Sequence, residues 1–187
     1  MSQQELLKKV VLILEQNDID YMLTGSLVSS MQGEPRLTHD IDIVINLKKT
    51  DINKIFISFP PEKYYISEKA IVESYSKKTL FNVIDFDDGD KIDFWILTDS
   101  AFDLNRFSRR RKTKFMDYFI YLPTPEDTIL EKLFWSKISG SSEKHFKDAL
   151  RVYEVQKEKL DFDYLKKWAE KLEVSNSWNK LLESTEY

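Results

Sequence analysis

The 187-residue sequence contains no cysteine and only two histidines. The lack of cysteine excludes disulfides and thiolate metal sites, and His39 and His145 leave little for a zinc site built from imidazoles. Any bound metal must therefore have oxygen ligands. No apolar run approaches the roughly 20 residues that a membrane span needs, and the N-terminus has no signal-peptide pattern. We expect a soluble, cytoplasmic protein with no membrane partner.

Glycine and proline are also scarce, with four and five residues, and no repeat, low-complexity run or flexible linker interrupts the chain. With 42% hydrophobic and 13% aromatic residues, the chain can bury a sizeable core. We expect a sheet-containing core over residues 1–122 and a helical region over residues 123–187 that packs on it. The net charge of −4 gives no protein-wide attraction for polyanions.

One segment departs from this acidic background. Residues 106–114 carry six cationic side chains in nine positions. Such a run is either a solvated helix end or turn, or a surface for phosphate or nucleic acid. The sequence alone leaves both interpretations open.

Hydrophobic periodicity predicts a chain of mixed helices and strands. The turn at residues 87–90, Asp-Asp-Gly-Asp, indicates a hairpin between the two strands that flank it. Strands are predicted over about 19–24, 39–47, 79–86 and 90–97, with an extended stretch over 115–122. Helices are predicted over about 3–17, 50–57, 67–77, 101–109, 142–157, 161–172 and 175–184, and another starts at Thr124-Pro125.

A tight turn between a strand and a helix falls at Gly25-Ser26. Glycine permits a close approach to the backbone, and the first N–H groups of a helix have no partner within the helix. A phosphate fits such a turn. A Gly-Ser pair before a helix is also an ordinary N-cap.

Two carboxylates lie on one predicted strand, at Asp40 and Asp42. Side chains two residues apart in a strand point to the same face, so Ile41 and Ile43 bury the opposite face and His39 points away from the carboxylates. Adjacent carboxylates repel each other unless a cation lies between them, and oxygen ligands suit Mg²⁺ or Mn²⁺. On a surface strand, two aspartates can also simply be solvated.

A third carboxylate, Asp93, interrupts an otherwise apolar strand. Burial of an unpaired charge is costly, so Asp93 needs a metal, a substrate hydroxyl or an edge position facing water. Asp85, in the preceding strand, is the alternative third acidic position. A phosphate turn followed by three carboxylates on two strands provides the parts of two-metal phosphoryl-group chemistry.

Residues 24–45, TGSLVSSMQGEPRLTHDIDIVI, resemble the nucleotidyltransferase superfamily that shares the fold of DNA polymerase β, in particular its small AbiEii toxin-like members. The shared features are Gly-Ser, a spacer of thirteen residues, and Asp-x-Asp followed by apolar residues, with Arg36 and Thr38 ahead of the aspartates. The resemblance covers residues 20–97. It implies an α+β nucleotidyltransferase fold, with a central mixed β-sheet flanked by helices and a helical C-terminal region.

The resemblance also implies an enzyme that transfers a nucleoside monophosphate from a nucleoside triphosphate to an acceptor hydroxyl and releases pyrophosphate. Two Mg²⁺ ions, or Mn²⁺, would be held by Asp40, Asp42 and Asp93, the same residues that would be catalytic. The implied nucleotide-binding residues are Gly25, Ser26, Arg36, Thr38, Lys132 and Asp148.

The last two assignments have simpler alternatives. A lysine on a helix, such as Lys132, is usually solvated. Asp148, in the implied pair Lys147-Asp148, can instead pair with Lys144 or Arg151 at helical spacing.

The acceptor and partners rest on the resemblance alone. The superfamily modifies tRNA ends, protein side chains and small molecules, and the toxin-like branch favours RNA or protein as the acceptor and an antitoxin-like partner. A noncatalytic nucleotide- or partner-binding module of the same fold is the alternative, although clustered carboxylates destabilise a scaffold without cations. A nuclease or phosphatase is disfavoured by the Gly-Ser turn ahead of the aspartates.

Overall fold

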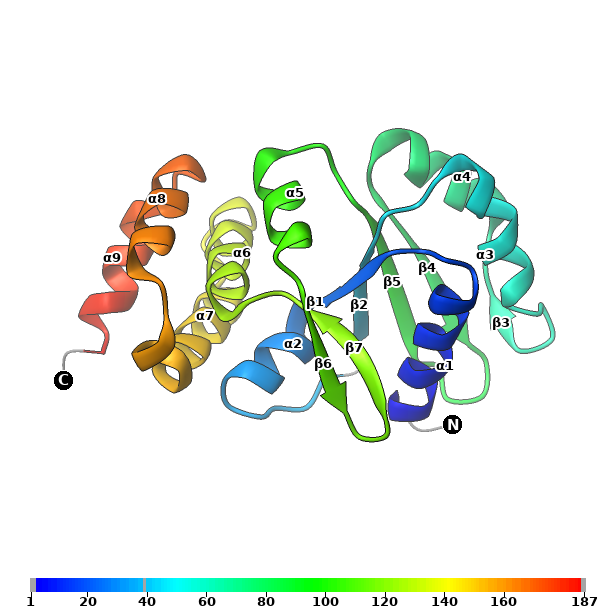
Figure 1. The fold of residues 1–187 in the computed structure, drawn as a ribbon, viewed down its shortest axis with the longest axis horizontal. Coiled ribbons are helices and arrows are strands. Elements are labelled where there is room, and N and C mark those ends of the chain that lie inside the picture. The colour runs from blue at the N-terminus through cyan, green and yellow to red at the C-terminus, as the bar shows by residue number, and fades with distance from the viewer. Residues whose placement is uncertain (1–2, 39, 186–187) are drawn as a thin grey trace. The chain divides into compact units, whose positions relative to one another are not determined.

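The computed structural model describes residues 3–38 and 40–185 (Figure 1). The chain separates into two units. The first comprises Met1–Leu27 and Thr38–Leu122, and the second comprises Val28–Leu37 and Pro123–Tyr187. His39, which we predicted to point away from the carboxylates, lies outside the described residues. None of the described helices is long and apolar enough to cross a lipid bilayer.

The first unit is built on a five-stranded mixed sheet with the strand order β1-β2-β5-β4-β3. The strands are β1 (Tyr21–Thr24), β2 (Asp40–Ile45), β3 (Tyr64–Tyr65), β4 (Leu80–Asp85) and β5 (Lys91–Ile96). β2 and β5 are parallel, whereas the other neighbouring strands are antiparallel. The predicted hairpin is confirmed as β4 and β5. We did not predict β3, since two residues are too few to show an alternating pattern.

One face of this sheet is apolar. Ile41, Ile43 and Ile45 are completely buried there, and the ring of Phe94 lies 6.1 Å from that of Phe59, which follows α3. Figure 1 shows α1, α3 and α4 grouped on one side of the sheet. The helices of the first unit are α1 (Gln3–Gln16), the start of α2 (Gly25–Gln32), α3 (Ile52–Ser58), α4 (Glu68–Lys77) and α5 (Ala101–Ser108).

The opposite face carries the carboxylates. Phe107 of α5 packs there in a buried cluster with Met22, Val44 and Leu97. Val44 lies in the second half of β2, so Asp40 and Asp42 lie on the same face towards the start of the strand. The apolar cluster therefore ends where the acidic side chains begin.

β6 (Arg111–Phe115) and β7 (Tyr118–Leu122) form a separate two-stranded sheet. β7 matches the predicted extended stretch. β6 falls in the basic segment, where the alternation of cationic and polar residues gives no apolar period, so we did not predict a strand there.

The second unit is helical. Its helices are the end of α2, α6 (Pro125–Ile138), α7 (Glu143–Gln156), α8 (Phe162–Lys171) and α9 (Ser175–Glu183). α6 begins as the sequence predicts, since the Thr124 hydroxyl accepts the backbone N–H of Asp127. The α+β fold class, with a mixed sheet, flanking helices and a helical C-terminal region, is confirmed. The packing of residues 123–187 on the core stays a prediction.

Candidate functional site

Two of the predicted carboxylates are brought together by the pairing of β2 with β5. The register of these parallel strands places Asp42 beside Asp93 and Asp40 beside Lys91. Because side chains alternate along a strand, all four point to the same face of the sheet. The Asp-x-Asp strand and the later carboxylate therefore form one acidic site.

Asp85, the alternative third acidic residue, lies on the other face. β4 places Asn82 beside Asp93, and Asp85 is three residues further along the strand. Its carboxylate accepts the backbone N–H of Asp87 at 2.8 Å. Asp85 therefore stabilises the turn after β4 and does not join the site.

Lys91 balances part of the negative charge. Its Nζ lies 2.8 Å from Oδ2 of Asp93 and 3.9 Å from Oδ1 of Asp40. The hydrogen bond with Asp93 is the main cause of the raised pKa of Lys91; burial opposes it, and the charges of Asp93, Asp40 and Asp42 add to it. We missed Lys91 in the sequence, although strand alternation already places it on the face of Asp93.

The other oxygen of Asp93 has a different environment. The residue is 8% exposed, and its Oδ1 is buried without a hydrogen-bond partner among the residues that the structure describes. A buried carboxylate oxygen in this state is suited to a cation or a hydroxyl group.

The chemistry of the acidic site fits Mg²⁺ or Mn²⁺, because three carboxylates supply oxygen ligands and Asp93 Oδ1 is available. Within residues 3–38 and 40–185, however, no group of three acidic or histidine side chains is gathered closely enough to hold a metal ion. Lys91 interacts with both Asp40 and Asp93. A cation shared by these two carboxylates would therefore have to displace its ammonium group.

Gly25 and Asp42 are in close contact. Gly25 starts α2 with a φ of +73°, and a Cβ atom at this position would lie 2.0 Å from Oδ2 of Asp42. On the other side, Trp95 donates from Nε1 to Oδ1 of Asp42 at 3.2 Å. The half-buried Ser26 follows Gly25 in the first turn of the helix. The carboxylate of Asp42 thus lies against the turn that we predicted to bind phosphate, and a side chain at Gly25 would displace it.

The remaining predicted residues are Thr38, in the first unit, and Arg36, Lys132 and Asp148, in the second. The backbone carbonyl of Thr38 accepts a hydrogen bond from Nε2 of Gln3 at 2.9 Å. This contact ties the residues before β2 to the start of α1.

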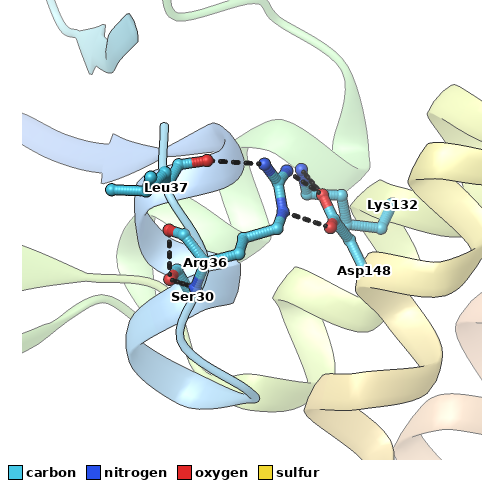
Figure 2. Close-up of polar contacts among 5 residues, drawn as sticks. All are labelled: Ser30, Arg36, Leu37, Lys132 and Asp148. Atoms are coloured by element: carbon cyan, nitrogen blue, oxygen red, sulfur yellow. Dashed lines mark hydrogen bonds and ion pairs between the residues drawn. The ribbon is translucent and has the colours of Figure 1, made fainter. Parts of the chain in front are cut away.

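Arg36, Lys132 and Asp148 form one cluster within the second unit (Figure 2). Nε and Nη2 of Arg36 donate to Oδ1 and Oδ2 of Asp148, each at 2.9 Å. Nζ of Lys132 donates to the same Oδ2, also at 2.9 Å. The backbone N–H of Arg36 donates to Oγ of Ser30 at 2.7 Å, and its Nη1 donates to the carbonyl of Leu37 at 3.3 Å. Asp148 therefore positions both cations.

The cluster is largely buried, and the two cations set the pKa of its carboxylate. Lys132 and Asp148 are each 3% exposed, and the two cations Arg36 and Lys132 share the carboxylate of Asp148. Burial on its own raises the pKa of Asp148, but the hydrogen bonds and charges of Arg36 and Lys132 outweigh this effect and lower it. Asp148 pairs with these residues rather than with Lys144 or Arg151, and Lys147 pairs with Glu143 at 3.4 Å.

Removal of the shared carboxylate is expected to destabilise the fold strongly. In Asp148→Ala, the buried ammonium group of Lys132 loses its counter-ion, and we expect the free energy of unfolding to fall by about 3–5 kcal/mol. Urea denaturation at neutral pH measures this loss. Glu143→Ala is the matched control, because it removes a carboxylate from an exposed pair on the same helix and should change stability by less than about 1 kcal/mol.

The stability loss in Asp148→Ala should depend on pH. Because the folded-state pKa of Asp148 is lowered, its stabilising effect is complete above the unfolded-state value of about 4 and is lost as the pH falls through the folded-state pKa. The stability difference between the wild type and Asp148→Ala should therefore narrow below about pH 4. A difference that stays constant to lower pH would contradict the charge-based role.

The chain matches no sequence-family model and no curated protein. Comparison with solved structures shows that its fold is that of nucleotidyltransferases. An antigenic nucleotidyltransferase-like protein from Paracoccidioides brasiliensis has a TM-score of 0.64 and 16% sequence identity, covering 99% of this chain and 90% of that one.

Two antibiotic-modifying proteins have similar folds. The lincosamide antibiotic adenylyltransferase LnuA, in its lincomycin-bound form, has a TM-score of 0.55 and 16% identity, covering 83% of this chain and 98% of that one. ANT(2")-Ia in complex with adenylyl-2"-tobramycin has a TM-score of 0.57 and 12% identity, covering 94% of this chain and 99% of that one. The predicted resemblance is thus confirmed for the fold, and the narrower likeness to AbiEii-type toxins stays a prediction.

Proposed function

We propose that this chain is a nucleotidyltransferase that transfers a nucleoside monophosphate from a nucleoside triphosphate to an acceptor hydroxyl. The observation that supports this most is the position of Asp42. Its carboxylate touches the backbone of the Gly25-Ser26 turn and lies beside Asp93 across the parallel strands. A phosphate-binding turn and an acidic site are therefore directly adjacent, as this reaction requires.

In this reaction the oxygen of the acceptor hydroxyl attacks the α-phosphorus, and the bond to the pyrophosphate oxygen breaks. The first N–H groups of α2, at Gly25 and Ser26, bind the oxygens of a terminal phosphate. Oδ1 of Asp93, which is buried and has no described partner, either holds a cation or accepts the proton that the hydroxyl loses.

Asp40, Asp42 and Asp93 would hold the divalent cations. Bound Mg²⁺ or Mn²⁺ would neutralise the triphosphate and lower the pKa of the attacking hydroxyl. By the resemblance, Arg36 and Lys132 are nucleotide-binding residues, and Asp148 positions both of them. Thr38 supports the backbone ahead of β2.

For the class of acceptor we rely on the toxin-like resemblance, which favours RNA or protein. The same resemblance favours an antitoxin-like partner. The similar antibiotic-modifying structures make small hydroxyl compounds the other class to examine.

The experiment is a label-transfer assay. The purified protein is incubated with Mg²⁺ and each α-labelled nucleoside triphosphate, separately with total RNA, lysate protein, lincomycin and tobramycin. We expect label on one acceptor class, with release of one pyrophosphate per label. A γ-labelled nucleotide should transfer nothing. If no acceptor is labelled and no nucleotide binds, the proposal is wrong.

The second candidate is a noncatalytic nucleotide-binding module of the same fold. The observation that favours it is Lys91, whose ammonium group already pairs with Asp93 and lies 3.9 Å from Oδ1 of Asp40, and so balances part of the charge that a metal would balance. This alternative predicts nucleotide binding without label transfer, and no dependence of binding on Mg²⁺.

Lys91 also allows a test of the metal site that needs no turnover. In Lys91→Met the carboxylates lose their counter-charge, so we expect a lower Tm without Mg²⁺ and a larger rise in Tm when Mg²⁺ is added than in the wild type. Thermal unfolding across a Mg²⁺ titration measures both. Lys69→Met, at an exposed position on α4, is the control. An unchanged Mg²⁺ response in Lys91→Met would contradict competition between Lys91 and the metal.

A further inference from the structure

The β6–β7 hairpin has two different faces. Its register pairs Thr113 with Ile120 on one face, and Ile120 is completely buried. The other face, which we call the hairpin face, consists of the paired residues Lys112 and Tyr121 and the paired residues Lys114 and Phe119. Lys112, Lys114 and Phe119 of the hairpin face are exposed, whereas Tyr121 is half-buried and packs edge-on against the buried Tyr21, with the ring centroids 5.4 Å apart.

The hairpin face combines cations with aromatic rings. Lys112 and Lys114 are exposed, and Phe119 is 49% exposed. Nζ of Lys112 lies 5.2 Å from the ring centroid of Phe119 and 6.0 Å from that of Tyr121. Each lysine is thus the cross-strand neighbour of an aromatic residue.

Two other cations of the basic segment have structural partners. Arg106 is buried and donates from Nε to Oδ1 of Asp103 at 2.8 Å. Arg110 donates from Nη2 to Oδ1 of Asp20 at 2.7 Å. These two arginines belong to the fold, whereas Lys112 and Lys114 have exposed side chains on an outward surface.

Negative charge on the hairpin is already compensated. The sequence of residues 111–122 contains one acidic residue, Asp117. Its carboxylate accepts a hydrogen bond from Nζ of Lys8, which also lowers its pKa. The hairpin face therefore keeps a positive charge on a protein whose net charge is −4.

We propose that the hairpin face binds single-stranded nucleic acid. Lysines that track a phosphate backbone, beside aromatic rings on which bases stack, form the usual arrangement for sequence-tolerant binding of single strands. An acidic peptide would use the lysines but leave the half-exposed ring of Phe119 without a role. The inference holds with or without nucleotidyl transfer, because it concerns binding at a surface that contains none of the proposed catalytic residues.

The test measures fluorescence anisotropy of a labelled oligothymidylate and a labelled oligouridylate of about 12 nucleotides, without nucleoside triphosphate or Mg²⁺. We expect dissociation constants of about 1–100 µM that weaken steeply between about 50 and 200 mM salt. Lys112→Ala with Lys114→Ala should weaken binding and reduce the slope of log K against log salt by about 1.4. Phe119→Ala should weaken binding about tenfold and leave the slope unchanged.

The matched control is Lys166→Ala with Lys167→Ala, which removes the same charge from exposed positions on α8 and should leave affinity unchanged. Three results would overturn the inference: no binding at about 50 mM salt, equal losses in both double variants, or unchanged binding in Phe119→Ala. Equal competition by polyglutamate or by anionic lipid vesicles would instead assign the hairpin face to acidic proteins or to a membrane surface.

Discussion

Asp93→Asn is expected to reduce nucleotidyl transfer by at least about a hundredfold. Asparagine has the size of aspartate but carries no negative charge, so it neither holds a divalent cation nor accepts the proton of the acceptor hydroxyl. The effect should appear in kcat, since the triphosphate is bound by other groups. Label transfer from an α-labelled nucleotide at saturating concentration measures it.

Asp85→Asn is the matched control for this variant. Asp85 is a buried carboxylate on the adjacent strand, but it lies on the opposite face of the sheet. Asparagine keeps a carbonyl oxygen that can accept the N–H of Asp87. Activity close to that of the wild type is therefore expected for Asp85→Asn. Thermal unfolding should show that both variants are folded. Similar activity losses in the two variants would contradict the assignment of Asp93.

The elements of the fold were largely predictable, because most of them carry a clear period. Ile41, Ile43 and Ile45 alternate with Asp40, Asp42 and Val44, and β2 forms where this alternation predicts a strand. The parallel pairing of β2 with β5 could not be predicted, because it depends on contacts between residues that are about fifty positions apart in the sequence. The strand β6 was missed since its residues are held by pairing with β7 rather than by an apolar face of their own.

The site was predictable as a set of residue types but not as a set of contacts. Strand alternation indicates that Asp40 and Asp42 share a face, and this is the arrangement that the strand pairing of β2 produces. Alternation also places Lys91 beside Asp93, but only the structure gives their distance of 2.8 Å. Helical spacing gave the wrong partners for Asp148, because its true partners lie on a loop and on another helix.

The structure also changes the interpretation of Asp148. Both of its oxygens accept hydrogen bonds from cations, so its carboxylate is already engaged within the second unit. A residue in this state acts on a nucleotide through the groups it positions, here Arg36 and Lys132. Loss of Asp148 should therefore lower the stability of the fold, and it should weaken nucleotide binding only because Arg36 and Lys132 are no longer held in place.

Gly25→Ala is expected to reduce transfer by about a hundredfold, although it adds a single methyl group far smaller than any substrate. The new Cβ would lie 2.0 Å from Oδ2 of Asp42, a distance that no pair of unbonded atoms tolerates. Because Trp95 also binds this carboxylate, Asp42 must give up its position or the turn must move. Either change separates the phosphate-binding turn from the acidic site, and a misplacement of about 1 Å is enough for such a loss.

Gly89→Ala separates this contact from backbone strain. Gly89 has a φ of +74°, nearly the same as the +73° of Gly25, but nothing lies within 4 Å of the Cβ it would gain. Both variants therefore incur the left-handed strain of about 1–2 kcal/mol, and only Gly25→Ala also displaces a carboxylate. Urea denaturation should show the shared strain, while transfer rates and calorimetric Mg²⁺ binding should fall in Gly25→Ala alone. If the two variants lose activity and Mg²⁺ affinity equally, the contact between the turn and Asp42 has no functional role.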